Sequence, residues 1–434
     1  MRYKNAFYSS LQARLVLCVA SYLQNKVLKT LPRLQGLFVK INQWIFHNGK
    51  QGVKIAFLKM GLNFLNLVSK ICYTILFKRK KMQILEFFYE NAPQNKPTTS
   101  RKVRLDSQNT LIKGARHSGK KSLILDYLSG FERDKYLFLD FEDVRFSEKC
   151  LENLAKFVLN KQASAQDLKI IVFYGVSKDF SYDFAPLLKH AQIIVASEFS
   201  SLKIPNFKEI KLDFLDFEEF VSLSKKNAPI NSQVGAFLQA GRSFCADLNE
   251  HLRAHFCDLE REILRHIALN LGAEFSANEL YGRLKRKQKI SKDSLYKAIS
   301  ELENRGVVHF LPFANKRLKK AYFGDFALKN ALCIDKNFKQ LFANVIFTEL
   351  FKLKDELVYD NSFEFYLLNA KTAFIPSPTL DIALIELKAK KLLSKALEIG
   401  IFHIVFITLS TQHRFFESGV KVEALPFDEW ALGF

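Results

Sequence analysis

Continuous apolar runs and stretches with helical spacing alternate along the chain after residue 82. The runs TLIK, KYLFLDF, LKIIVFYGV and AQIIVAS are bounded by polar residues, which is typical of strands buried on both faces of a sheet. Between the first two runs, the apolar residues from Leu123 to Leu128 fall on one helical face. Strands that alternate with helices predict a parallel sheet with helices on its faces.

After residue 258 the apolar residues are spaced by three and four positions, which predicts helices. Ser276 and Ser291 are good N-cap residues for the second and third of these helices. Gly306 is placed to end the third helix, and VVHFLPF then predicts a strand. Three short helices followed by a strand are typical of a winged helix-turn-helix, here over 258–316. The residues expected to face its core are Leu259, Ile263, Ile267, Leu271, Leu295, Ile299 and Leu302.

The net charge of +21 suggests an anionic partner, but it is unevenly distributed along the 434 residues. Residues 1–81 contain fifteen Lys or Arg and no acid, and the first acid is Glu86. The rest of the chain has 50 basic and 44 acidic residues, so its net charge is +6 and argues only weakly for nucleic acid. The six cysteines form no CxxC pair, which fits free thiols in a reducing cytoplasm.

The acid-free extension 1–81 has two interpretations. It contains apolar stretches, but Lys59 and Lys70 interrupt the longer one, which makes it a poor membrane span. It is either a basic amphipathic or targeting segment, with a membrane surface as its partner, or translated sequence upstream of a true start at Met82.

A phosphate-binding loop is predicted between the first strand and the first helix. Gly114, four further residues, Gly119 and Lys120 give the spacing GxxxxGK. Glycines let backbone N–H groups cradle phosphates, and the lysine reaches the terminal phosphates. An ordinary glycine turn is the alternative. The residues expected to contact ATP or ADP are Gly114, Ser118, Gly119, Lys120, Lys121 and Ser122.

The magnesium side of this loop departs from the pattern. The hydroxyl that normally ligates Mg2+ is replaced by Lys121, and Ser122 lies about 100° further round the helix. Lys121 would instead bring a second ammonium group to the phosphates. The strand ending at Tyr174 and Gly175 also lacks the carboxylates that hold magnesium. Asp140 and Glu142 are either substitutes for them or ordinary strand-end acids, so the use of Mg2+ stays open.

The segment IKGARHSGKKSLIL resembles the GPRQVGKT loop of the archaeal-type ATPases, a prokaryotic family of the AAA+/STAND group. IKLDFLDFEEFVSL, KKAYFGDFALKNAL and VKVEALPFDEWAL are similar to three later segments of that family, in the same order. The resemblance implies a P-loop core at 82–225, a helical lid or linker at 226–257 and the winged helix at 258–316. It also implies a nuclease-like domain of the PD-(D/E)XK type at 317–434.

The winged helix offers a candidate DNA-binding surface. Its third helix is expected to expose Lys292, Ser294, Tyr296 and Lys297. Basic residues also precede this helix and lie at the expected wing, where phosphate contacts belong. The alternative is a protein-packing module with a solvated charged surface. The basic residues are Arg283, Lys285, Arg286, Lys287, Lys289, Lys316, Arg317, Lys319 and Lys320.

The stretch LDIALIELKAK is interpreted as a strand, which places Glu386 and Lys388 on one face. That is half of a nuclease pattern in which acids hold a metal and a lysine activates water. The resemblance adds Glu364, from a preceding hairpin, and Glu349, from the helix before it. Glu386 and Lys388 are therefore the predicted catalytic residues, and Glu349, Glu364 and Glu386 the predicted metal ligands. A salt-bridged surface is the alternative.

Together these patterns predict a multi-domain α/β protein of the cytoplasm: a P-loop parallel-sheet core, an all-α winged helix and an α/β nuclease-like domain. The predicted function is an ATP-binding, AAA+-like switch that acts on or near DNA, with the missing magnesium ligands arguing against hydrolysis. The alternative is a non-catalytic scaffold or regulator with degenerate ATPase and nuclease-like domains. The sequence leaves the oligomeric state open.

Overall fold

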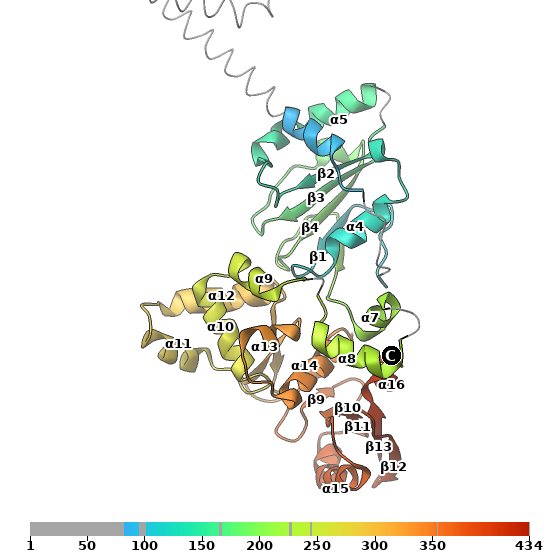
Figure 1. The fold of residues 1–434 in the computed structure, drawn as a ribbon, viewed down its shortest axis with the longest axis vertical. Helices are drawn as coiled ribbons and strands as arrows, with labels where there is room; N and C mark the ends of the chain where they lie inside the picture. The colour runs from blue at the N-terminus through green and yellow to red at the C-terminus, as the bar shows by residue number, and fades with distance from the viewer. Residues whose placement is uncertain are drawn as a thin grey trace, which may run out of the picture. The chain divides into compact units, whose positions relative to one another are not determined.

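The computed structural model describes residues 82–94, 101–164, 167–224, 228–243, 245–353 and 355–433 (Figure 1). The chain divides into Met1–Ile84 and Leu85–Phe434, and the described sheets all lie in the second unit. The predictions made for 1–81 lie outside the described residues. Within the described ranges, no helix has both the length and the apolar character needed to cross a membrane.

The first part of the second unit is a five-stranded parallel sheet, in which the four apolar runs form four strands as predicted. The fifth strand, Lys208–Lys211, was not predicted. Its order is β2-β3-β4-β1-β5, so β1 lies between β4 and β5. Strands β1 to β4 are largely buried, and Ile171, Val172 and Phe173 are fully buried, whereas the edge strand β5 exposes most of its residues. The elements are β1 (Thr110–Lys113), α4 (Lys120–Leu128), β2 (Tyr136–Asp140), α5 (Leu154–Ala163), β3 (Ile170–Val176), α6 (Ala185–Leu188), β4 (Gln192–Ser197) and β5 (Lys208–Lys211), with a helix over 82–90.

Three helices follow the sheet: α7 (Phe217–Leu223), α8 (Ile230–Ala240) and α9 (Leu248–His255). Asp216 begins α7 with a capping box, because its carboxylate accepts from the Glu219 amide while the Glu219 side chain accepts from the Asp216 amide. Asp247 caps α9 by accepting from two backbone amides.

The next part contains α10 (Asp258–Leu269), α11 (Ala277–Lys285) and α12 (Lys292–Asn304), followed by a hairpin of β6 (Val308–Pro312) and β7 (Lys319–Phe323). The predicted caps are confirmed: Ser276 accepts from the Glu279 amide and Ser291 from the Ser294 amide. Because β7 pairs with β6, the predicted division after residue 316 falls inside this hairpin.

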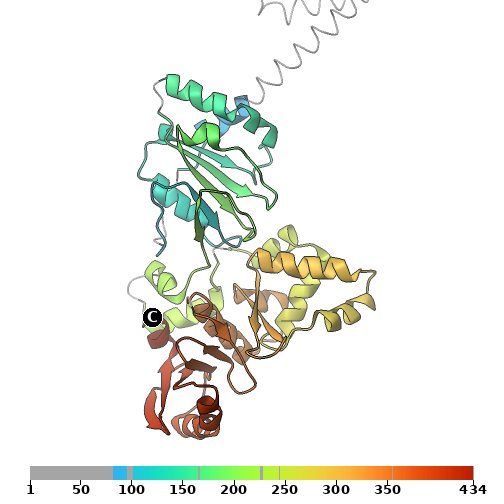
Figure 2. The ribbon, with the colours of Figure 1, turned by 180° about the vertical axis from the view of Figure 1, so that it is seen from behind.

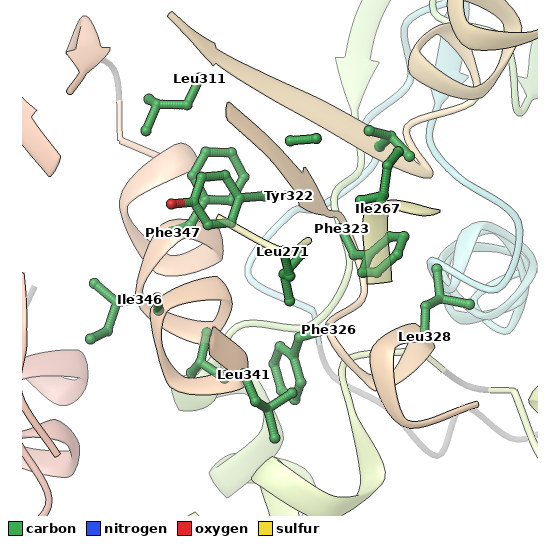
Figure 3. Packing of buried hydrophobic residues seen from close by; sticks show 14 of the residues in the cluster. Ile267, Leu271, Leu311, Tyr322, Phe323, Phe326, Leu328, Leu341, Ile346 and Phe347 are labelled. Atoms are coloured by element: carbon green, nitrogen blue, oxygen red, sulfur yellow. The ribbon is translucent and has the colours of Figure 1, made fainter. Parts of the chain in front are cut away.

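Aromatic rings join this hairpin to the helix that follows it. The ring of Tyr322 on β7 stacks on Phe347 of α14 (Phe338–Phe351), with 4.4 Å between the ring centroids. Figure 3 shows both rings beside Leu271, with Phe323 and Phe326 in the same core. The hydrophobic core is therefore continuous from α10, α11 and α12 into the last part of the chain.

The last part is a six-stranded mixed sheet, shown from both sides in Figures 1 and 2. Its order is β12-β13-β11-β10-β9-β8, with parallel pairing only from β13 through β11 to β10 among the described strands. Its elements are α13 (Ala327–Leu332), β8 (Leu357–Val358), β9 (Phe365–Leu367), β10 (Thr372–Pro376), α15 (Ile382–Glu398), β11 (His403–Thr408), β12 (His413–Glu417), β13 (Val420–Pro426) and α16 (Phe427–Leu432).

The predicted strand carrying Glu386 and Lys388 is wrong, because these residues lie in the helix α15. Asp381 caps this helix by accepting from the Leu384 amide. The buried positions Ile385 and Ala389 are four residues apart, which is helical spacing. Two residues span about 200° of a helix, so Glu386 and Lys388 do not share a face as they would on a strand.

Candidate nucleotide-binding site

The phosphate-loop sequence lies at the carboxyl end of β1, between that strand and α4. Parallel strands β4 and β5 flank β1, so Glu198 and Leu212, which follow them, lie at the same edge of the sheet as the loop. In open parallel sheets, ligands bind at this edge where neighbouring strands diverge. The strand, turn and helix predicted from GxxxxGK are therefore present.

Two glycines are needed for the shape of this loop. A Cβ on Gly114 would lie 2.2 Å from the Leu212 carbonyl oxygen, closer than atoms can approach. Gly119 has a φ of 90°, in the left-handed region that other residues rarely adopt. His117 also has a positive φ, of 62°. The loop thus follows a tight path that brings its backbone close to itself.

Lys120 reaches back into the loop. Its ammonium group donates to the carbonyl oxygens of Gly114, at 2.7 Å, and Ala115, at 2.8 Å. Burial lowers the pKa of Lys120 to about 8, although Glu198 and Glu142 oppose this effect from nearby. No carboxylate of the described residues lies within ion-pair distance of it. A buried cation held only by carbonyl oxygens is suited to an anionic ligand.

Ser118 provides a second polar group in the loop. Its hydroxyl is buried and has no hydrogen-bond partner among the described residues. Its carbonyl oxygen accepts from Arg101 at 2.6 Å, and Arg101 also pairs with Glu219 at 2.9 Å. Arg101 therefore fixes the loop from outside. Together Gly114, Gly119, Lys120 and the unpaired Ser118 hydroxyl fit a phosphate group.

The magnesium side does not fit a metal. The ammonium of Lys121 pairs with Asp140 at 3.1 Å and lies 5.4 Å from the centre of the Tyr174 ring. Glu142 pairs with Arg116 at 2.7 Å and packs against Gly175, where a Cβ would lie 2.6 Å from its Cγ. Each nearby acid thus has a cationic partner, and the metal-binding hydroxyl is absent. Ser122 lies within α4, half buried.

One acid connects the loop to α12. Glu198, directly after β4, lies 3.7 Å from Arg116 of the loop and 3.5 Å from Arg305, at the end of α12. The same end of α12 is hydrogen-bonded to the chain after β4, since Asn304 accepts from the Ser200 amide and hydroxyl. A cavity of about 240 Å³ borders Gly114, Glu198 and Arg305.

The proposed DNA-facing surface of α12 is exposed as expected. Lys292, Ser294, Tyr296 and Lys297 all face solvent, while Leu295 is buried. The basic residues on and after α11 and at the hairpin tip are exposed as well. Two wing residues are engaged elsewhere: Lys319 lies 3.5 Å from the centre of the Phe310 ring, and Lys320 pairs with Glu364 at 3.0 Å.

The four predicted nuclease residues have different bonding partners, although Glu364 lies close enough to Lys388 to influence its pKa. Glu349 is buried, accepts from the Phe217 amide and pairs with Lys352. Glu364 accepts from Tyr322 and Lys320, and Glu386 contacts His413 at 2.9 Å. Burial lowers the pKa of Lys388, with Glu364 opposing. In the described part of the chain, Glu349, Glu364 and Glu386 do not gather into a metal-binding group.

Some residues at the site gave no signal in the sequence. Arg101, Glu198 and Arg305 are distant from the loop along the chain and belong to no short motif. His117 was within the quoted loop, yet its contact with His251, 3.2 Å between ring nitrogens, joins residues 134 apart. Burial lowers the pKa of His251 to about 3. Only the fold brings these groups together.

The fold and the loop define an α/β protein with a parallel-sheet core and a phosphate-loop turn. No family model and no curated protein matches the chain. Among solved structures, it is similar to a STAND protein with a tetratricopeptide repeat sensor from Pyrococcus horikoshii, at 15% identity and a TM-score of 0.22. That match covers 61% of this chain and 48% of the other, so the chain spans about half of that protein.

Two further structures are similar in the same loose sense. The Aeropyrum pernix ORC1 protein in complex with DNA matches at 14% identity and a TM-score of 0.29, over 55% of this chain and 89% of that one. Drosophila ORC bound to AT-rich DNA and Cdc6 matches at 12% identity and a TM-score of 0.19, over 52% and 85%. At these TM-scores the similarity carries no function over to this chain.

Proposed function

We propose that this protein binds ATP or ADP at the loop 114–120 and uses the nucleotide as a conformational switch. The observation that carries the proposal is Lys120, a buried ammonium group without a carboxylate partner among the described residues. Phosphate oxygens would replace the two carbonyl oxygens as its acceptors. The unpaired Ser118 hydroxyl would gain a partner at the same time.

The contacts around Glu198 supply a route for the switch. Phosphates at the loop would compete with Glu142 and Glu198 for the Arg116 guanidinium, because all three are anionic. Glu198 would then be held by Arg305 alone, which changes how the end of α12 is fixed to the sheet. Nucleotide occupancy would thereby bias the position of α10–α12.

Hydrolysis is not part of the proposal. A switch that binds without turnover needs the phosphate side of the site, which is present, and not the magnesium ligands. Lys121 replaces the usual hydroxyl ligand, and Gly175 stands where a strand-end carboxylate would. We expect nucleotide binding with little dependence on Mg2+.

A titration with a fluorescent ATP analogue, with and without Mg2+, tests this proposal. Lys120→Ala should abolish binding, whereas the control Lys156→Ala, an exposed lysine on α5, should leave it unchanged. Equal affinity of the wild type with and without metal supports the metal-independent switch. Absence of binding by the wild type would end the nucleotide proposal.

We further propose that α12 contacts DNA through its exposed first turns. The observation that favours this is the set Lys292, Ser294, Tyr296 and Lys297, exposed beside the basic residues after α11. The rival function is a scaffold in which these helices pack against another protein. Fluorescence anisotropy with a labelled duplex at several salt concentrations separates the two. A DNA contact predicts affinity that falls steeply with salt, and a scaffold predicts no binding.

For the C-terminal sheet we propose a binding or packing role without DNA cleavage. Glu349 and Lys352 form an ion pair with each other, and Glu349 also accepts from the first amide of α7, which is a structural use of the carboxylate. Strand β10, which pairs with β9, is Thr-Ala-Phe-Ile-Pro and carries no acid or lysine. A plasmid-nicking assay in Mn2+, comparing the wild type with Glu386→Ala, tests this role.

A further inference from the structure

His117, Cys245 and His251 converge from two parts of the chain. His117 belongs to the phosphate loop, Cys245 lies between α8 and α9, and His251 lies on α9. One ligand atom from each lies within 4.8 Å of the others, and no other such group of three His, Cys, Asp or Glu exists among the described residues. Cys245 forms no disulfide.

The spacing of the two imidazoles matches what a metal needs. Two nitrogens bound tetrahedrally to zinc at 2.0–2.1 Å would lie about 3.3 Å apart. His117 Nε2 and His251 Nδ1 lie 3.2 Å apart. A thiolate ligand at about 2.3 Å from the metal would lie about 3.6 Å from each nitrogen, and the three ligand atoms already lie within 4.8 Å of one another.

A small cavity adjoins these three side chains. Its volume is about 20 Å³, and His117, Cys245, His251 and Asp325 all line it. A cavity of this size holds about one water molecule. Asp325 is 2% exposed, and its Oδ2 has no hydrogen-bond partner within the described ranges, while its Oδ1 accepts from the Arg242 and Ala327 amides. This buried carboxylate oxygen is thus available beside the cluster.

We propose that His117, Cys245 and His251 bind a divalent transition metal of the zinc class. The fourth position is left to a water molecule that donates to Asp325 Oδ2. Two imidazoles and one thiolate are ligands that zinc prefers, and a carboxylate that accepts from a metal-bound water is a common outer partner. The charges also balance, because the thiolate and the Asp325 carboxylate offset the dication.

The cationic neighbours do not oppose this site. Arg116 and Arg305 line the same cavity, but each is paired with acids: Arg116 with Glu142 and Glu198, and Arg305 with Glu198 and Glu260. A metal here would tie the phosphate loop to α9 through His117. The metal site shares the loop 114–120 with the proposed nucleotide site through His117, but neither Lys120 nor Ser118 is a metal ligand.

Cobalt provides the test, because a cobalt–thiolate bond gives a charge-transfer absorption that a histidine contact alone does not. Full-length protein is stripped with a chelator, the chelator is removed, and Co2+ is titrated in. We expect one equivalent per chain, a thiolate charge-transfer band and displacement by Zn2+. No band, or a band with no defined stoichiometry, would overturn the proposal.

Variants assign the band to this cluster. Cys245→Ser should lose it, and His251→Gln should weaken cobalt binding by more than about 100-fold, since even outer partners contribute 10–100-fold. The control is Cys257→Ser, an exposed cysteine at the N-cap of α10, where serine is a better cap. A band that persists in Cys245→Ser refutes the proposal. Excess Zn2+ should also raise the thermal midpoint of the wild type, and should leave the midpoints of Cys245→Ser and His251→Gln unchanged. A cooperative thermal transition in these two variants separates loss of the metal from misfolding.

Discussion

The lowered pKa of Lys120 makes the stability of the nucleotide-free protein depend on pH. The group is buried without an ion-pair partner among the described residues, and its pKa falls from 10.5 to about 8 on folding. Below pH 8 the lysine is charged in both states, so the folded state carries the whole cost of burying the charge. Between about 8 and 10.5 the unfolded state binds more protons, so stability rises with pH.

The size of this effect follows from the shift. A pKa difference of about 2.5 corresponds to about 3 kcal/mol of unfolding free energy between pH 8 and pH 10.5. Other lysines and tyrosines titrate in the same range, so the informative quantity is the difference between wild type and Lys120→Met. That difference should change by about 3 kcal/mol in favour of the wild type as pH rises.

Urea unfolding of the nucleotide-free protein at pH 7.5, 9 and 10.5 measures the difference in unfolding free energy between the wild type and Lys120→Met. Lys156→Met is the matched control and should run parallel to the wild type at every pH, because this lysine is exposed. Parallel curves for Lys120→Met as well would refute the reasoning, since they would mean that the loop does not hold an uncompensated charge.

Three further predictions concern the loop, the α12 surface and the C-terminal sheet. Gly114→Ala should destabilise the protein by about 1–3 kcal/mol, because its Cβ would clash with the Leu212 carbonyl. Gly235→Ala, in α8 with open space around it, should stabilise the protein by about 0.5–1 kcal/mol. Thermal midpoints check both variants, and shifts of the same sign in the two would contradict the prediction. The double variant Lys292→Ala with Lys297→Ala should lower the slope of log affinity against log salt for DNA by about 2, measured by anisotropy, and an unchanged slope would place the phosphate contacts elsewhere. Glu386→Ala should leave plasmid nicking in Mn2+ at the wild-type background, and nicking that disappears with this change would restore the nuclease hypothesis.

Local patterns predicted most of the fold. The apolar runs indicated four strands of the parallel sheet because the side chains of those strands are buried, whereas β5 is largely exposed and gave no apolar run. Ser276 and Ser291 marked helix starts because a cap depends only on nearby amides. The strand predicted around Glu386 was wrong because, over a few residues, IALIEL fits the alternation of a strand as well as helical spacing. The Asp381 cap and the buried Ile385 and Ala389 decide for the helix.

The candidate site was predictable only in part. Gly114, Gly119 and Lys120 lie within one short segment, so their spacing indicated the loop. The partners of that loop lie far from it in the sequence, because Arg101, Glu198 and Arg305 are brought to it by the strand order of the sheet and by helix packing. No spacing in the sequence relates Cys245 to His117, and their proximity depends on how the segment between α8 and α9 lies against the loop.

Glu198 has a thermodynamic consequence that results from its two arginine partners. It is in ion-pair range of Arg116 on the loop and Arg305 on α12, so a ligand at either end alters the environment of the same carboxylate. Linkage is reciprocal. If bound nucleotide changes the affinity of α12 for a partner, that partner must change the affinity for nucleotide by the same factor. Glu198→Gln should therefore reduce both effects equally, and the protein would report its partner's presence as a change in the nucleotide concentration at which the loop is half occupied.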